Sequence, residues 1–246
     1  MTTPRPKPLR AVTFDYWDTL VDGAAEVERT RLRRASLRRL FADAGHPLDA
    51  EAVATLHREA GAELDRWWRE EQRGYSTAEA VRLILARGGV TGADDALVDR
   101  TAADINDALV AVPPRLIEGA AELLGRLAPR FAFAIVSDTG IASGDAQNRV
   151  LALHGILDRF HATVYSMDIG WCKPRPEPFR AALAALGVAP GEAIHVGDIE
   201  RTDVRGALAV GMRAIRVDVV RVSGSSDAEL VVTRLAEIGD YLLALS

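Results

Sequence analysis

Three short apolar runs of the chain are each followed at once by polar side chains. The runs occupy residues 11–14, 131–136 and 193–196. The polar residues that follow them are Asp15, then Ser137 with Asp138, and then Asp198, with Asp203 five residues further on. Carboxylates held close together repel one another unless a cation lies among them. Oxygen donors without neighbouring cysteine or histidine are typical of Mg²⁺ sites, and an aspartate can also attack phosphorus to form an aspartyl phosphate.

Basic and hydroxyl side chains elsewhere fit the same chemistry. Lys173, which precedes the segment "PRPEPF", can neutralise negative charge on a substrate. The hydroxyls of Thr19 and Ser137 can donate hydrogen bonds to phosphate oxygens. Together with the aspartates, these residues form a set suited to holding a phosphate group beside a metal ion.

The apolar runs predict the strands that must position this set. Residues 214–217 and the short "TVY" at 163–165 also have the composition of buried strands. Helical patterns lie between the runs, at residues 118–130, 176–187 and 200–211. This alternation predicts an α/β fold with a doubly wound, Rossmann-like parallel sheet. Ligands bind at the carboxyl ends of the strands in such sheets, so we expect the polar residues to converge there.

The alternation of strand and helix is interrupted once. After the first run no strand pattern occurs until the second, and residues 24–111 form successive helical patterns separated by segments rich in Gly and Pro. We therefore expect an inserted helical domain that is closed by the turn "VPPR". The predicted domains are an α/β core at residues 1–20 and 115–246 and a helical cap at residues 21–114.

Three of the polar clusters resemble motifs of the haloacid dehalogenase superfamily of hydrolases. The segment "TFDYWDTL" is similar to the first motif, with Asp15 in the nucleophile position and Thr19 in the hydroxyl position. The segment "FAIVSDTG" is similar to the second motif, with Ser137 as the phosphate-binding hydroxyl. The segment "GWCKPRPEPF" is similar to the third, with Lys173 as its lysine.

The fourth motif of the superfamily resembles "HVGDIERTDVRGALAVGM", with Asp198 and Asp203 in the metal-binding positions. The four motifs, in order, imply a Mg²⁺-dependent phosphatase of a small phosphate ester whose helical cap closes over the site. The implied catalytic residues are Asp15, Lys173, Ser137 and Thr19. The implied metal ligands are Asp15, the backbone carbonyl of Trp17, Asp198 and Asp203.

Arginines of the insertion are a second candidate source of substrate contacts. The segment "RTRLRRASLRRLF" at residues 29–41 carries six arginines among apolar residues at helical spacing. It is typical either of a solvated helix face or of a helix from which Arg33 or Arg34 reaches the cleft to bind an anionic substrate. The candidate substrate-binding residues are therefore Ser137, Asp138, Lys173, Trp17, Arg33 and Arg34.

Position 17 departs from the resemblance. Phosphatases of the superfamily have there a second aspartate, which protonates the leaving group and then activates water, whereas this chain has Trp17. An indole exchanges no proton near neutral pH. Another acid, such as Asp18 or a residue of the cap, can substitute. Alternatively, the chain is a dehalogenase of the 2-haloacid type, because halide leaves without protonation, or a catalytically impaired protein that binds a ligand or partner. Retention of Asp198 and Asp203 favours metal and phosphate over halide.

Several conspicuous residues have structural interpretations. His195 lies within a predicted strand and is typical of a satisfied core residue. Cys172 is the sole cysteine, which excludes an internal disulfide, and we expect an inert thiol. Adjacent helix positions point about 100° apart, so Trp67 and Trp68 favour packing in the core or against the cap.

Composition and charge limit the classes of partner. The 246 residues carry 30 basic and 35 acidic side chains, a formal net charge of −5, which gives no reason to expect a nucleic acid. The N-terminal "MTTPRPKPLR" lacks the apolar run of a secretory signal. No apolar run of about 18 residues occurs. We therefore expect a cytoplasmic location and no membrane partner. The sequence leaves the substrate open, and also the choice between monomer and homodimer.

Overall fold

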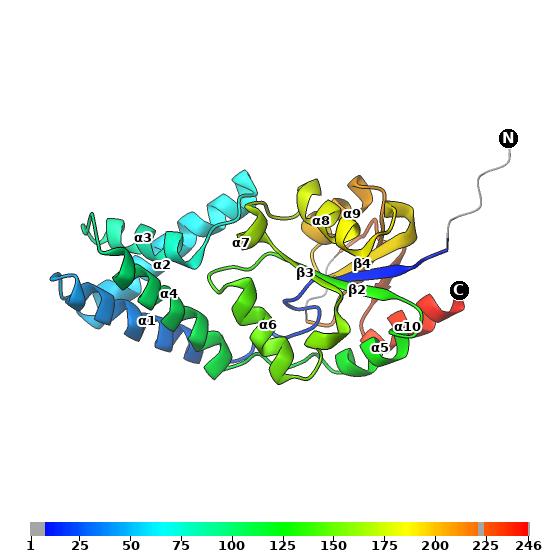
Figure 1. Ribbon diagram of the computed structural model, residues 1–246, viewed down its shortest axis with the longest axis horizontal. Coiled ribbons are helices and arrows are strands. Elements are labelled where there is room, and N and C mark those ends of the chain that lie inside the picture. The colour runs from blue at the N-terminus through cyan, green and yellow to red at the C-terminus, as the bar shows by residue number, and fades with distance from the viewer. Residues whose placement is uncertain (1–7, 221–223, 246) are drawn as a thin grey trace.

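The computed structural model describes residues 8–220 and 224–245 and has an α/β part and a helical part (Figure 1). The first seven residues of the N-terminal segment inspected for a signal lie outside the described residues. Six strands form one parallel sheet in the order β3-β2-β1-β4-β5-β6. They are β1 Ala11–Phe14, β2 Ala132–Ser137, β3 Ala162–Tyr165, β4 Ala193–Gly197, β5 Arg213–Val217 and β6 Leu230–Val232.

The predicted α/β fold with a parallel sheet is confirmed. The five strands expected from sequence agree with β1 to β5 to within one residue at each end. The edge strand β6 was not expected, because its three residues are too short to form an alternating pattern.

Helices cover both faces of the sheet (Figure 1). Val12 and Phe14 belong to an apolar cluster shared with α5 (Ala120–Leu127), α6 (Gly144–Leu153) and α10 (Leu235–Ala244). Ala11 belongs to a second cluster, shared with α8 (Pro176–Leu186) and α9 (Arg205–Ala209). Because side chains alternate along a strand, each of the strands β1 to β5 contributes to both clusters. The shorter helical segments of this part are η2 Leu157–Arg159, α7 Ser166–Ile169, η3 Pro190–Glu192 and the π-helical η4 Glu200–Val204.

A helical region is inserted between β1 and β2, as the sequence predicts. Its elements are α1 Glu26–Asp43, α2 Ala50–Arg66, the π-helical η1 Trp67–Glu71, α3 Thr77–Arg87 and α4 Asp95–Ala111. These helices have an apolar cluster of their own, which includes Leu40, Phe41, Val81 and Ile84. Side-chain caps define two of the starts: Asp49 accepts from Ala52 N, and Ser76 forms a capping box with Glu79. Within the described ranges, no helix has both the length and the apolarity needed to cross a bilayer.

The chain enters and leaves the insertion along two paired segments. The Ile117 amide donates to the Leu20 carbonyl at 2.9 Å, and the Asp22 amide donates to the Arg115 carbonyl at 2.9 Å. The Asp22 carboxylate also pairs with the Arg115 guanidinium at 2.9 Å. These contacts lie beside residues 21 and 114, the predicted boundaries of the insertion.

The insertion meets the α/β part a second time near the C-terminal end of η1. The Gly74 amide donates to the Gly170 carbonyl and the Cys172 amide to the Gln72 carbonyl, both at 2.9 Å. A Cβ atom at Gly74 would overlap the Ser166 carbonyl, so only glycine permits this approach of the two backbones. The insertion is thus tied to the α/β part at two places, at its connecting segments and at residues 72–74.

Candidate active site

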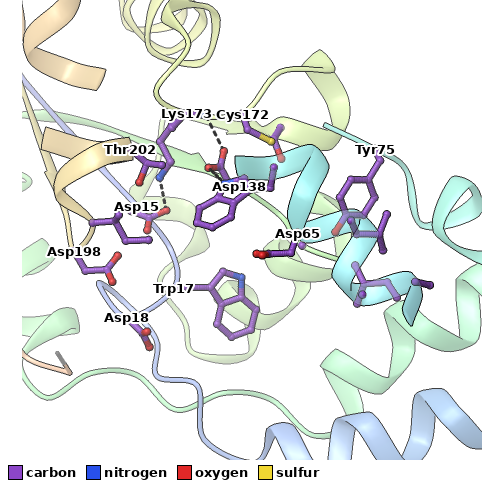
Figure 2. Close-up of a pocket in the computed structure, with 18 of the residues that line it drawn as sticks. Asp15, Trp17, Asp18, Asp65, Tyr75, Asp138, Cys172, Lys173, Asp198 and Thr202 are labelled. Carbon is purple, nitrogen blue, oxygen red and sulfur yellow. Dashed lines mark hydrogen bonds and ion pairs between the residues drawn. The ribbon is translucent and has the colours of Figure 1, made fainter. Parts of the chain in front are cut away.

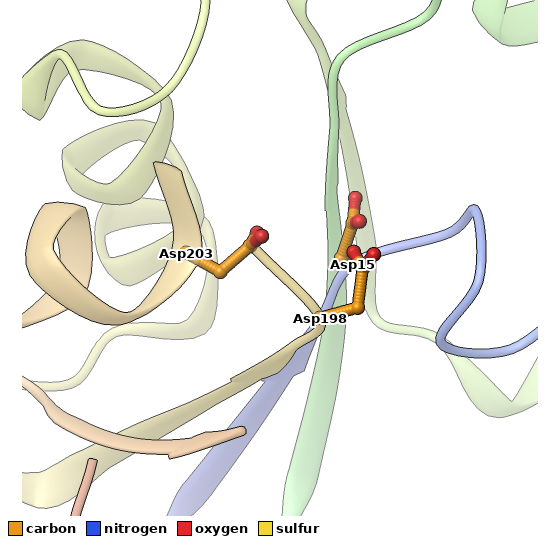
Figure 3. Close-up of side chains that lie close together, drawn as sticks. All are labelled: Asp15, Asp198 and Asp203. Atoms are coloured by element: carbon orange, nitrogen blue, oxygen red, sulfur yellow. The ribbon is translucent and has the colours of Figure 1, made fainter. Parts of the chain in front are cut away.

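The register of β1 brings three acidic residues together. Phe14 pairs with Val196 of β4, and the Asp15 amide donates to the Val196 carbonyl at 2.8 Å. Asp15 therefore leaves the sheet beside the first residues after β4. One carboxylate oxygen from each of Asp15, Asp198 and Asp203 lies within 4.8 Å of the others, and all three residues are buried (Figure 3).

Lys173 lies among these carboxylates. Its ammonium nitrogen Nζ is 2.7 Å from Asp15 Oδ1 and 2.6 Å from Asp203 Oδ1. Burial disfavours the charged form of the lysine, but the two carboxylates raise the pKa of Lys173. Burial raises the pKa of Asp15. The charge of Lys173 opposes this rise, and the charge of Asp203 adds to it. The site thus holds one buried cation against an excess of carboxylates.

Both oxygens of Asp203 are occupied by protein donors. Oδ1 lies 3.1 Å from His195 Nε2 as well as beside Lys173, and Oδ2 accepts from the Ile199 amide and the Thr202 hydroxyl. Although burial acts in the opposite direction, Lys173 and His195 lower the pKa of Asp203. A Cβ atom at residue 197, a glycine in this chain, would overlap the Asp203 carboxyl group, so the close approach requires that glycine.

His195 has the buried position expected for it, and it also orients the acidic cluster. Its ring lies between the Thr13 hydroxyl, 2.8 Å from Nδ1, and Asp203. Burial lowers the pKa of His195, which Asp203 opposes. This second contact could not be predicted from the sequence, because nothing in the spacing of His195 and Asp203 fixes the bend of η4 between them.

The acidic cluster opens into a cavity of about 390 Å³ between the strand ends and the insertion (Figure 2). The lining residues from the α/β part include Asp15, Trp17, Asp18, Asp138, Cys172, Lys173, Asp198 and Thr202. Those from the insertion include Arg33, His57, Leu64, Asp65, Trp68, Tyr75 and Ile84. Burial, with Arg34 and Arg33 nearby, lowers the pKa of His57 to about 4, so the ring is neutral near pH 7.

Trp17 forms part of the cavity wall, and its indole extends into the cavity (Figure 2). It contacts the Tyr16 ring edge-on at a centroid distance of 5.0 Å, and the Arg29 guanidinium lies 5.8 Å from its centroid. In the turn after β1, the Tyr16 carbonyl accepts from Leu20 and Val21. No hydrogen bond between described residues uses the carbonyl of Trp17.

Two of the predicted hydroxyl residues lie outside the cavity lining. Ser137 is buried at the end of β2 and donates to Gln147 Oε1 at 3.1 Å. Thr19 is fully buried, and its hydroxyl has no hydrogen-bond partner within the described part of the chain. Ser137 is the last residue of β2 and Thr19 lies in the turn after β1, so both are at the edge of the sheet where Asp15 is placed.

The two candidate arginines of α1 face different surroundings. Arg33 is buried against the cavity, with Nη1 2.6 Å from Glu26 Oε1. Arg34 lines another hollow, between α1 and α2, together with Arg38 and Val53. The structure therefore brings Arg33 to the acidic site and does not bring Arg34 there.

Asp138 connects the α/β part to the insertion across the cavity. Its Oδ1 accepts from the Lys173 amide at 3.0 Å, and its Oδ2 accepts from Trp68 Nε1 at 2.8 Å. The Arg201 guanidinium lies 5.0 Å from the centroid of the Trp68 ring. Trp68 thus packs against the α/β part, which was one of its expected positions, but its hydrogen bond to Asp138 had no signal in the sequence.

The neighbouring thiol of Cys172 is buried, and burial raises its pKa to about 12. A thiol with so high a pKa stays protonated near neutral pH and is a poor nucleophile. The carboxylates, rather than this sulfur, are therefore the chemically active groups of the cavity. Three carboxylates with oxygen donors alone are suited to a hard divalent cation, and the cluster could bind a metal.

Comparisons with known proteins agree with this site. A sequence model of the family "haloacid dehalogenase-like hydrolase" matches residues 9–211. Phosphoserine phosphatase from Thermus thermophilus is 46% identical over 74 residues, and this match spans 30% of each chain. Glyceraldehyde 3-phosphate phosphatase from Methanothermobacter thermautotrophicus is 27% identical over 215 residues, which cover 85% of this chain and 86% of that protein.

A solved structure shares the fold over almost the whole chain. The 2-haloacid dehalogenase from Pseudomonas syringae superposes with a TM-score of 0.71 at 24% identity, covering 96% of this chain and 98% of its own. At this identity the likeness shows the fold alone. The family match, in contrast, covers β1 to β4, the insertion and the polar residues of all four clusters. The chain therefore belongs to the family of haloacid dehalogenase-like hydrolases.

Proposed function

We propose that the chain is a Mg²⁺-dependent phosphatase of a small phosphate ester that reacts through an aspartyl phosphate at Asp15. The main support is the position of Asp15, whose carboxylate lines the cavity beside Lys173 and Asp198. The curated relatives described above are named as phosphatases, which supports the same class of substrate.

In the proposed reaction, Asp15 attacks the phosphorus atom in line with the leaving group. Asp15 Oδ1 is held by Lys173, whereas Oδ2 accepts no hydrogen bond from the described residues. We therefore assign Oδ2 as the attacking oxygen. Lys173 favours the ionised form of Asp15, against the effect of burial on its pKa, and stabilises negative charge on the phosphoryl group.

The metal ligands we propose are Asp15, Asp198 and the carbonyl of Trp17, which the fold leaves without a hydrogen bond. Asp203 belongs to the same cluster, but its oxygens already accept from several protein donors. We therefore assign Asp203 chiefly to positioning Lys173. When bound, Mg²⁺ supplies positive charge that neutralises the phosphoryl oxygens.

The remaining candidates have supporting roles in this proposal. The unpartnered Thr19 hydroxyl and Ser137 orient the phosphoryl group after local adjustment. Arg33 and Trp17 line the part of the cavity that receives the leaving group. A buried guanidinium with an unpaired Nε favours an anionic or polar group on the substrate.

A screen of phosphate esters with and without Mg²⁺ tests the proposal. We expect metal-dependent release of inorganic phosphate from p-nitrophenyl phosphate. The Asp15→Asn variant, checked for folding by circular dichroism, should lose at least about 10⁴-fold in kcat, as removal of a catalytic nucleophile does. Unchanged turnover in this variant would refute the nucleophile assignment.

The same assays separate the two alternatives. Release of halide from a 2-haloacid without added metal would identify a dehalogenase. Binding of Mg²⁺ and of a phosphate analogue without turnover of any ester would identify a catalytically impaired binding protein.

A further inference from the structure

The cavity contains three carboxyl groups outside the acidic cluster, contributed by Asp18, Asp65 and Asp138. Any acid that compensates for Trp17 must face this cavity, because the leaving group departs into it. Asp18 directly follows the proposed carbonyl ligand Trp17. Asp65 is half exposed, and its carboxylate is ion-paired with Arg69 at 2.7 Å.

Asp138 differs from Asp65 in its surroundings. Its two oxygens accept from the neutral N–H groups of the Lys173 backbone and of Trp68. None of the ion pairs between described residues involves Asp138, since the Lys173 ammonium is engaged by Asp15 and Asp203. Burial raises the pKa of Asp138, which the charge of Lys173 opposes. A carboxyl group that faces a cavity and holds its proton more strongly than usual is the pattern of a general acid.

We propose that Asp138 is the general acid and base of this enzyme, in place of the aspartate that Trp17 replaces. The inference rests on the proposed phosphatase function. In the first step, Asp15 Oδ2 forms a bond to phosphorus, the bond from phosphorus to the leaving oxygen breaks, and that oxygen takes the proton of Asp138. In the second step, water attacks phosphorus and gives a proton to the Asp138 carboxylate, and the bond from phosphorus to Asp15 breaks. Inorganic phosphate leaves, and both carboxyl groups return to their starting states.

The contact with Trp68 places this acid under the control of the insertion. Trp68, which lies on η1, donates a hydrogen bond from Nε1 to Asp138 Oδ2. The guanidinium of Arg201, from η4, packs on the Trp68 ring. Figure 2 shows Asp138 beside Lys173. An open insertion would release this hydrogen bond. The acid is therefore fixed in position only when the insertion lies over the cavity.

Esters with good and poor leaving groups test the proposal. A p-nitrophenolate ion leaves without a proton, whereas the alkoxide of 2-phenylethyl phosphate needs one. In Asp138→Asn, kcat/KM for the alkyl ester should fall about 10²–10⁴-fold, and that for p-nitrophenyl phosphate less than about 10-fold. The value of kcat/KM reports only the steps up to loss of the leaving group. Slower hydrolysis of the aspartyl phosphate therefore leaves kcat/KM unchanged. That second step should slow, so the variant should show a burst of nitrophenolate.

Four variants serve as comparisons. Trp17→Asp introduced into Asp138→Asn should restore alkyl ester hydrolysis at least 10-fold, on the order of the contribution of one general acid. Trp68→Phe keeps a ring but removes the donor that holds Asp138 Oδ2, so it should lower kcat/KM for the alkyl ester more than for p-nitrophenyl phosphate. If Asp65→Asn or Asp18→Asn, rather than Asp138→Asn, loses the alkyl ester selectively, the proposal is wrong.

The pH profile of the unmodified enzyme gives a readout that does not depend on the folding of a variant. The groups around Asp138 are Lys173, Cys172, Asp203 and, across the cavity, Asp65 and Tyr75, with Arg201 over Trp68. We expect kcat/KM for the alkyl ester to fall on the alkaline side, where Asp138 loses its proton, and no such limb for the aryl ester. Identical profiles would overturn the inference and leave the proposed function intact. An enzyme inactive towards both esters would refute the proposed function and the inference with it.

Discussion

The two walls of the cavity are built differently. The strand-end wall holds Asp15, Lys173 and Asp203 in a buried network in which each charge contacts an opposite one. The insertion wall is mostly apolar and aromatic, with Leu64, Trp68, Tyr75 and Ile84, and its buried cation is Arg33. The first wall is fixed by strand register, and the second by the packing of helices. This difference agrees with the proposal that the strand ends carry the chemistry, and it leads us to expect that the insertion selects the substrate.

The largest expected effect comes from removing the cation of the strand-end wall. Lys173→Met leaves two carboxylates buried without their partner, which should lower the free energy of unfolding by about 3–5 kcal/mol in metal-free buffer. Urea denaturation measures this change. In contrast, Arg234→Met breaks an exposed pair with Glu237 and should cost less than about 1 kcal/mol. Equal losses would show that the buried network does not stabilise the fold.

Metal binding should stabilise the strand-end wall alone. At a Mg²⁺ concentration of 100 times Kd, the free energy of unfolding should rise by about 2.7 kcal/mol. Asp198→Asn removes a proposed ligand and should abolish this increase, whereas Asp65→Asn on the insertion wall should keep it. Thermal denaturation with Mg²⁺ or EDTA measures both. If Mg²⁺ still raises the free energy of unfolding of Asp198→Asn, the metal binds elsewhere.

Substrate selection should depend on the arginine that reaches the cavity. Arg33→Met should raise KM at least about tenfold for an ester whose leaving group carries a carboxylate, because a charge-assisted hydrogen bond contributes about 1.5–3 kcal/mol. An uncharged ester of similar size should be affected less. Arg34→Met is the matched control, because Arg34 lines a different hollow. The same increase in both variants would contradict the assignment of the insertion wall.

The smallest expected effect is a pH dependence of stability at the contact between the walls. Burial raises the pKa of Asp138 above its ordinary value of 3.8, so the folded state binds the proton more tightly than the unfolded state. The stability that this group contributes is present below pH 3.8 and is lost as the pH rises through the folded pKa. The variant Asp138→Asn has no such proton. Its free energy of unfolding relative to the unmodified protein should therefore rise as the pH increases from 3.8 through the folded pKa of Asp138. Urea denaturation at several pH values checks the sign, and a constant difference would contradict it.

Sequence patterns were most informative for the strand-end wall. Asp15 and Asp198 were recognisable because buried strands have a distinct composition and parallel strands end at the same edge of the sheet. Lys173 was recognisable from the resemblance of its segment to the third motif of the superfamily. The helical insertion was equally plain from the loss of strand patterns between β1 and β2. The side chains of the insertion that line the cavity could not be predicted in the same way. Arg33 and Arg34, for example, fitted the helical spacing equally well.

The contact between Asp138 and Trp68 could not be predicted from the sequence for a related reason. The two residues are 70 positions apart, and their hydrogen bond depends on how the insertion is placed over the sheet. Trp68 has the same local pattern whether it packs inside the helical cluster or against the α/β part. Only the assembled structure distinguishes these positions.

The sequence by itself determined the succession of β1 to β5 and of the helices along the chain, the place of the insertion and the acidic residues at the strand ends. These features depend on local periodicity and on backbone geometry that repeats in every parallel sheet. The tertiary structure decided which side chains of the helices face the cavity and which acid meets Trp68. Those choices depend on the packing of surfaces distant in the chain, and a change of a few ångströms in that packing would select other residues.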